Sequence, residues 1–168
     1  MAPIVIVGPP GAGKSTIAQL VAERIGLAVR DTDADVEAEQ GVSVQDIFVE
    51  AGEARFRELE HAAVVRALAE HDGIVSLGGG APVHEDTRKL LREHRVVFLD
   101  VGLAQAAARV GMNSGRPLLL GNVRGQLKRL MDERRPVYLE VATTVIDTDA
   151  LSPDEVADAV IAFVEEAR

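Results

Sequence analysis

The sequence has no cysteine and very few aromatic residues. Without cysteine, the chain cannot form a disulfide, use a thiolate as a nucleophile or bind a metal through sulfur. Aromatic residues make up 3% of the chain, which excludes a stacking platform for single-stranded nucleic acid and leaves the core to aliphatic side chains. No apolar run approaches the roughly 18 residues that a membrane span needs.

Positive charge is also scarce. The chain has 18 basic against 27 acidic residues, a net charge of −9, which disfavours nucleic acid and anionic membranes as partners. An anionic substrate would therefore have to be bound by a local cluster of lysine and arginine.

The length of 168 residues predicts one domain, 1–168, with room for one ligand-sized cleft. The apolar content of 47% is enough for a packed core. Met1-Ala2-Pro3 runs directly into the first predicted strand, with no room for a signal peptide. We expect a cytoplasmic monomer.

Residues 8–15, with the sequence GPPGAGKS, match the pattern G-x-x-x-x-G-K-[ST] of a phosphate-binding loop. They lie between an apolar run at 4–7 and a helical pattern at 16–24, the strand-turn-helix setting that this loop requires. The glycines allow backbone N–H groups to surround an anion, and the helix directs its positive end to the same place. Lys14 is then expected to reach the β- and γ-phosphates, and Ser15 to bind Mg²⁺.

Apolar strands alternate with helices along the rest of the chain. Such strands predict an α/β fold, doubly wound, in which helices cover both faces of a parallel sheet. Helices are expected at 16–24, from Asp33 to Gly41, after Ser43, and at 53–70, 84–93 and 153–166. The five expected strands are 4–7, 27–30, 73–77, 95–99 and 144–147.

An acidic pair follows the second predicted strand. If the extended conformation continues to Asp33, Asp31 and Asp33 point to one face beside the phosphate loop, where one serves Mg²⁺ and the other accepts a hydroxyl proton. The alternative is that Asp31, Asp33 and Asp35 only cap the next helix.

Arg57 lies between Glu53 and Glu60 at helical spacings, which would orient its guanidinium for a bidentate grip on a carboxylate. A solvated ladder of ion pairs is the alternative. Residues 78–80 are three glycines after a buried strand, and they either admit a small polar ligand to the backbone or form a plain turn.

Residues 111–124 have little periodicity and three glycines, and predict either a mobile loop over a site or a surface loop. The segments 116–119 (RPLL) and 134–138 (RRPVY) contain further arginines beside prolines, the second after a predicted helix. No two of the four histidines stand at metal-ligand spacing, so structural or surface roles are expected for His61, His71, His84 and His94.

Taken in order, these segments resemble the shikimate kinase family. The resemblance rests on residues 8–15, Asp31-x-Asp33, Gly52-Glu53-x-x-Phe56-Arg57-x-x-Glu60, 78–80, 116–119 and Arg134-x-Pro136-x-Tyr138. It implies a three-layer α/β/α fold with a five-stranded parallel sheet, similar to nucleoside monophosphate kinases, with a mobile lid at about 111–124. The implied reaction, in chorismate biosynthesis, transfers the γ-phosphoryl of ATP to the 3-hydroxyl of shikimate.

The resemblance also assigns roles by position. Lys14, Asp33 and Arg116 are implied as catalytic, Asp33 being either a base or a group that orients the hydroxyl, and Ser15 and Asp31 as ligands of Mg²⁺. ATP binding is implied for Gly11, Ala12, Gly13, Lys14, Ser15, Thr16, Arg109, Arg116 and Pro153. Shikimate binding, within about 31–60 and beyond, is implied for Asp33, Phe48, Phe56, Arg57, Gly78, Gly79, Gly80 and Arg134, with Arg134 preferred to Arg135 from the R-x-P-x-Y spacing.

Other readings of the phosphate loop stay open from the sequence. A gluconate kinase is the nearest rival, although the pair Arg57 and Arg134 favours shikimate over a substrate recognised through hydroxyls. A guanine-nucleotide switch would carry an Asn-Lys-x-Asp motif, which the sequence lacks. A catalytically impaired regulatory relative is opposed by the presence of every residue proposed for the chemistry.

Overall fold

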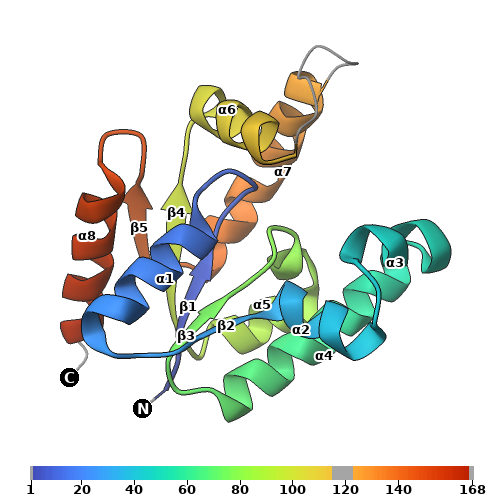
Figure 1. The fold of residues 1–168 in the computed structure, drawn as a ribbon, viewed down its shortest axis with the longest axis horizontal. Coiled ribbons are helices and arrows are strands. Elements are labelled where there is room, and N and C mark those ends of the chain that lie inside the picture. Colours follow the sequence, from blue (N-terminus) through green and yellow to red (C-terminus); the bar gives the residue numbers. More distant parts are fainter. Residues whose placement is uncertain (1, 115–122, 167–168) are drawn as a thin grey trace.

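A computed structural model describes residues 2–114 and 123–166 of the chain. Its centre is a five-stranded parallel sheet with the strand order β2-β3-β1-β4-β5 (Figure 1). The expected five parallel strands are therefore confirmed. The strands are β1 (Ile4–Val7), β2 (Val29–Asp31), β3 (Ile74–Ser76), β4 (Arg95–Asp100) and β5 (Thr144–Asp147).

Helices cover both faces of the sheet, which confirms the doubly wound, three-layer fold (Figure 1). One face packs against α1 (Lys14–Ile25), α6 (Leu103–Ser114) and α8 (Pro153–Glu165). The opposite face packs against α4 (Glu53–Glu70), α5 (Glu85–Leu91) and α7 (Val123–Val141). The remaining helices are α2 (Thr32–Gln40), α3 (Val44–Ala51) and the short 3₁₀ helix η1 (Ala81–Val83).

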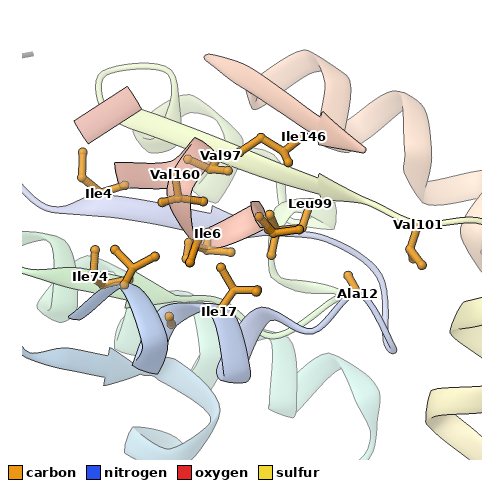
Figure 2. Packing of buried hydrophobic residues seen from close by; sticks show 14 of the residues in the cluster. Ile4, Ile6, Ala12, Ile17, Ile74, Val97, Leu99, Val101, Ile146 and Val160 are labelled. Carbon is orange, nitrogen blue, oxygen red and sulfur yellow. The ribbon is translucent and has the colours of Figure 1, made fainter. Parts of the chain in front are cut away.

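Strand β1 shows why the sheet is buried on both sides. Ile4 and Ile6 pack with α1 and α8, whereas Val5 and Val7 point to the other face and pack with α4 and α7. Figure 2 shows the first of these cores, in which Ile17 of α1 and Val160 of α8 lie beside Ile6. Side chains alternate along a strand, so apolar residues at every position require helices on both faces.

All five strands run in the same direction, so their carboxyl ends form one edge of the sheet. Val7 is paired with Phe98 and Asp31 with Ser76 at this edge. The segments that directly follow these strands carry residues 8–13, Asp33 in the first turn of α2, and residues 78–80, and parallel sheets bind ligands at this edge.

Three details differ from the sequence predictions. Strand β2 begins at Val29 and not at residue 27, and α6 was not predicted. Residues 134–138 lie inside α7, with Pro136 in the helix, and not after it. Tertiary contacts outweigh the cost of that proline, because Tyr138 and Val141 of the same helix are buried against the sheet.

The region at 111–124 is not a loop throughout. Residues 111–114 complete α6 and residues 123 and 124 begin α7. A single glycine costs a helix only about 1 kcal/mol, so Gly111 does not end α6. The rest of the expected lid, with Arg116, lies outside the described residues. Within the described part, no helix combines the length and apolar character that crossing a membrane requires.

Candidate active site

The phosphate loop joins β1 to α1. Gly11 and Gly13 have φ values of 83° and 87°, which favour glycine over residues with a side chain. Helix α6 packs directly behind the loop, and a Cβ on Gly11 would lie 2.7 Å from the Ala106 carbonyl oxygen. The loop conformation is thus enforced by its own glycines and by the backbone of α6.

Lys14 is turned back onto the loop that precedes it. Its Nζ donates to the carbonyl oxygens of Gly8, at 2.7 Å, and Pro9, at 3.0 Å. Burial lowers the pKa of Lys14 to about 8, although the carboxylates of Asp33 and Asp31 nearby oppose the change. A phosphate bound in the loop would give this ammonium a stronger partner than the two carbonyls.

A cavity of about 390 Å³ opens beside the loop. Its wall contains the expected nucleotide-binding residues from Gly11 to Thr16, together with Arg109 and Pro153. The structure brings all of them together at one site. Four further lining residues were missed by the sequence reasoning. One is Ile17 of α1, and the others fall between the end of β5 and the first turn of α8: Thr148, Leu151 and Val156.

Arg109 is fixed in the wall of this cavity by two hydrogen bonds. Its Nη1 donates to the Gly11 carbonyl oxygen at 2.9 Å, and its Nη2 donates to Gln105 at 3.0 Å. The guanidinium of Arg109 therefore belongs to the wall of this cavity, and its role in ATP binding stays a prediction.

The acidic pair does not lie on one extended segment, and this prediction was wrong. Helix α2 begins at Thr32, because the Asp31 carboxylate accepts from the N–H groups of Asp33, at 2.9 Å, and Ala34, at 3.2 Å. The alternative of helix capping is correct for Asp31. Asp35 is paired instead with Arg30, at 2.6 Å, away from the loop.

Asp33 nevertheless faces the site from the first turn of α2. A Cβ on Gly78 would lie 2.5 Å from Asp33 Oδ1, so the carboxylate lies directly against the glycine segment. This oxygen is buried and lacks a hydrogen-bond partner among the described residues. Burial, then the neighbouring Asp31, raises the pKa of Asp33, while Lys14 opposes the rise. The carboxylate is therefore able to accept a hydrogen bond from a ligand.

Arg57 is held by its own helix. Its Nη1 bonds Glu60 at 2.7 Å, and Nη2 lies 3.6 Å from Glu53. Glu60 is 2% exposed, so the alternative of a solvated ladder fails at this residue. The guanidinium also lies 5.8 Å from the Phe48 ring centroid and 5.3 Å from that of Phe56, so the two expected pocket residues are its neighbours.

Burial raises the pKa of Glu60 to about 7, and the Arg57 guanidinium limits this rise. Burying the Glu60 carboxylate costs free energy, and its bond to Arg57 fixes the direction of that guanidinium. Glu60 therefore restricts Arg57 to one orientation at the site.

The three glycines of residues 78–80 allow three charged side chains to approach one backbone segment. Asp33 lies against Gly78, a Cβ on Gly79 would lie 3.5 Å from Nη1 of Arg134, and one on Gly80 would overlap the Arg57 guanidinium. A plain turn would not require the close approach seen at Gly78 and Gly80.

The two arginines at 134 and 135 point to different places. Arg134 lies against Gly79, whereas Arg135 is half exposed and bonds Asp100 at 2.9 Å. The geometry agrees with the choice of Arg134 for the site.

The fold brings two histidines together that are far apart in the sequence. His61 and His84 stack at 4.4 Å between ring centroids and 4° between planes, and one ligand atom from each lies within 4.8 Å of Asp86. Imidazole lone pairs lie in the ring plane, and two parallel rings share no plane in which one ion could meet both. His61 Nδ1 is instead bonded to the buried Thr87 hydroxyl at 2.7 Å, and His84 Nδ1 accepts from the Asp86 N–H at 3.2 Å.

A parallel sheet of this order, with a phosphate loop after its central strand, defines a P-loop kinase. Among solved structures, shikimate kinase from Acinetobacter baumannii, in complex with shikimate, matches with a TM-score of 0.91 and 29% identity, covering 100% of this chain and 95% of that chain. A gluconokinase from Sinorhizobium meliloti 1021, at 21% identity and a TM-score of 0.66, covering 99% of this chain and 93% of that chain, shares the fold.

The sequence comparisons are more specific. The family model described as shikimate kinase matches residues 10–165. A shikimate kinase of Streptomyces avermitilis is 52% identical over 96% of this chain and 95% of its own length. One of Salinispora arenicola is 50% identical over 98% of this chain and 99% of its own. The chain belongs to the shikimate kinase family.

Proposed function

We propose that the site described above carries out the reaction of the family, in which the γ-phosphoryl of ATP passes to the 3-hydroxyl of shikimate to give shikimate 3-phosphate and ADP. The observation that carries the assignment of roles is the convergence of Asp33, Arg57 and Arg134 on the three glycines, next to the phosphate loop. A hydroxyl acceptor with a carboxylate fits a site with one carboxylate and two guanidinium groups.

On the donor side, ATP occupies the cavity beside the phosphate loop. The loop N–H groups and the N-terminus of α1 bind the phosphates, and Lys14 exchanges its bonds to Gly8 and Pro9 for phosphate oxygens. The adenine lies near Arg109 and Pro153, both of which line the cavity. Arg116 acts from the lid on the transferred phosphate, a role that falls outside the described residues.

The residues at the loop also fit Mg²⁺. The Ser15 hydroxyl and the Asp31 carboxylate are hard oxygen ligands, and Asp31 uses one oxygen, Oδ1, for its helix cap. Asp31 would then act through water with its other oxygen. When bound, Mg²⁺ neutralises charge on the β- and γ-phosphates.

On the acceptor side, Arg57 and Arg134 bind the carboxylate of shikimate, with Phe48 and Phe56 along the wall of the pocket. With the carboxylate bound there, the ring hydroxyls of shikimate point to Asp33. Asp33 Oδ1 accepts the hydrogen bond of the 3-hydroxyl, which supplies the partner that this buried oxygen lacks.

Transfer then requires one proton movement. The 3-oxygen forms a bond to the γ-phosphorus, the bond from that phosphorus to the β,γ-bridging oxygen breaks, and the hydroxyl proton passes to Asp33. The raised pKa of Asp33 suits a proton acceptor, since a carboxylate with a very low pKa would be a weak base. Lys14 and Arg116 remain on the developing negative charge.

Every group used in this scheme comes from one chain, which supports a monomer. Its donor, ATP, supports a cytoplasmic enzyme, and the acidic surface gives no support for a nucleic acid or membrane partner.

The test is ADP release measured in parallel with shikimate, gluconate and nucleoside monophosphates as acceptors. Shikimate alone should support ADP release, and methyl shikimate should be a poor acceptor because it lacks the charged carboxylate. Equal turnover of gluconate would favour the rival kinase. Equal turnover of methyl shikimate would show that the two arginines do not bind a carboxylate.

A further inference from the structure

Tyr138 is a buried polar residue of α7 that the proposed scheme does not use. It is 1% exposed, and its ring packs against Phe98 with 5.1 Å between centroids. Its hydroxyl donates to the Gly79 carbonyl oxygen at 2.6 Å. The buried Tyr138 ring therefore carries a hydroxyl that points to Gly79, the middle residue of the three glycines.

Arg134 lies on the same side of the helix. Residues four apart on a helix are neighbours on its surface, which places the Arg134 guanidinium beside the Tyr138 hydroxyl. Burial raises the pKa of Tyr138, and Arg134 next to its hydroxyl opposes the rise. Arg134 also lies against Gly79, the residue whose carbonyl Tyr138 binds.

These contacts form a closed arrangement of three groups. The Tyr138 hydroxyl has one proton, which it gives to Gly79, and its lone pairs are left to face Arg134. Through Gly79 the arrangement extends to the phosphate loop, because a Cβ on Gly79 would lie 3.3 Å from Pro10 Cδ and 3.5 Å from the Gly8 carbonyl oxygen.

We propose that Tyr138 is a positioning residue for shikimate: its hydroxyl holds the Gly79 backbone, through the Gly79 carbonyl oxygen, and the Arg134 guanidinium in the relative placement from which Arg134 binds the substrate carboxylate. This inference rests on the carboxylate-binding role proposed for Arg134. It adds a residue that touches neither substrate and acts through two groups that do.

Tyr138→Phe is the direct test, because phenylalanine keeps the ring against Phe98 and removes only the hydroxyl. We expect the KM for shikimate to rise about tenfold, in line with one hydrogen bond to a charged group. The KM for ATP and kcat should stay within about threefold of the wild type. An unchanged KM for shikimate, or an equal rise for ATP, overturns the proposal.

Thr143→Val is the matched control. It removes a side-chain hydrogen bond of similar kind, in which the Thr143 hydroxyl accepts from the Val96 N–H at 2.9 Å, at the opposite edge of the sheet. It should lower the melting temperature and leave both KM values unchanged. If it raises the KM for shikimate as Tyr138→Phe does, the effect is general destabilisation and the proposal fails.

A double-mutant cycle with Arg134→Ala separates this inference from the proposed function. If Arg134→Ala leaves the KM for shikimate unchanged, the carboxylate-binding role itself is wrong. If it raises KM, the effect of Tyr138→Phe in that background should shrink to less than about threefold, because Arg134 is no longer there to be positioned. Equal effects in both backgrounds overturn the positioning role alone.

A second measurement uses the wild-type chain and does not depend on how a variant folds. The sequence has one tyrosine and no tryptophan, so its ultraviolet absorption near 280 nm and its emission report mainly on Tyr138. Shikimate should change this signal in a saturable manner, because Arg134 gains a carboxylate partner beside the hydroxyl. The absence of any saturable change also overturns the proposal.

Discussion

Asp33 combines burial with an oxygen that has no partner among the described residues, and both properties follow from its place in the chain. Asp31 takes the capping position of α2, which leaves Asp33 in the first helical turn, beside Gly78. A carboxylate one residue earlier or later would lie on another side of the helix.

Asp33→Asn should lower kcat by about 10² to 10⁴ and leave the KM for ATP nearly unchanged. The amide keeps the shape of the side chain but cannot take up the hydroxyl proton. Steady-state kinetics with both substrates varied would measure this. The control is Asp35→Asn on the same helix, which removes one of the two acidic partners of Arg30 and should leave kcat unchanged. Near-wild-type turnover of the Asp33 variant would exclude both the base and the orienting role.

Arg57→Ala and Arg134→Ala should each raise the KM for shikimate by about 10- to 100-fold. Each removes a charge-assisted hydrogen bond worth about 1.5 to 3 kcal/mol from a carboxylate held away from water. Arg135→Ala is the matched control, because that side chain bonds Asp100 at a half-exposed position. If Arg135→Ala raises KM and Arg134→Ala does not, the choice between the two arginines was wrong.

At the scale of the elements, the sequence predicted what depends on local pattern. The five strands and the helices at 53–70 and 153–166 followed from apolar runs and helical patterns, to within one or two residues at most ends. The conformation around Asp33 did not, because an acidic pair after a strand fits both an extended segment and a helix cap. The inclusion of Pro136 in α7 also could not be predicted, since packing of that helix on the sheet outweighs the local penalty.

The same distinction applies to the site. The residues of the phosphate loop, Arg57 and the three glycines could be predicted from motif spacing, because each motif forms its structure within a short segment of the chain. Thr148 and Leu151 contribute to the nucleotide cavity only because β5 ends beside the loop. His61 and His84 meet because α4 and α5 pack together. Contacts of this kind join segments that are far apart in the sequence, so they could not be predicted without the fold.

Ser152→Ala should destabilise the protein by about 1 kcal/mol. Ser152 and Glu155 form a complete capping box at α8, whose first turn contributes Pro153 to the nucleotide cavity. Ser43→Ala removes a similar cap from α3, which lies away from that cavity. Both variants should lower the free energy of unfolding in urea, and only Ser152→Ala should raise the KM for ATP. An equal effect on that KM would contradict a local role for the cap.

For the whole molecule, the main electrostatic feature is the contrast between a net charge of −9 and a site built from cations. Arg57 lies close enough to influence the carboxyls of both Asp33 and Glu60, while Lys14 influences Asp33 and Arg134 influences Glu60. The local potential at the sheet edge is therefore set by these few residues and not by the sum over the surface. The buried carboxyls, in turn, make the stability of the fold depend on pH.

Glu60→Gln should change that dependence in a defined direction. The pKa of Glu60 is raised from 4.5 to about 7, so between these values the folded protein holds a proton that the unfolded chain has released. The contribution of Glu60 to the free energy of unfolding therefore falls as pH rises through this window. Glutamine does not titrate, and between about pH 5 and pH 8 the stability of Glu60→Gln relative to wild type should rise by on the order of 3 kcal/mol. Urea unfolding at both pH values measures it. The exposed Glu58→Gln on the same helix should show no such change, and a Glu60→Gln difference that is constant with pH would contradict the buried carboxyl as its source.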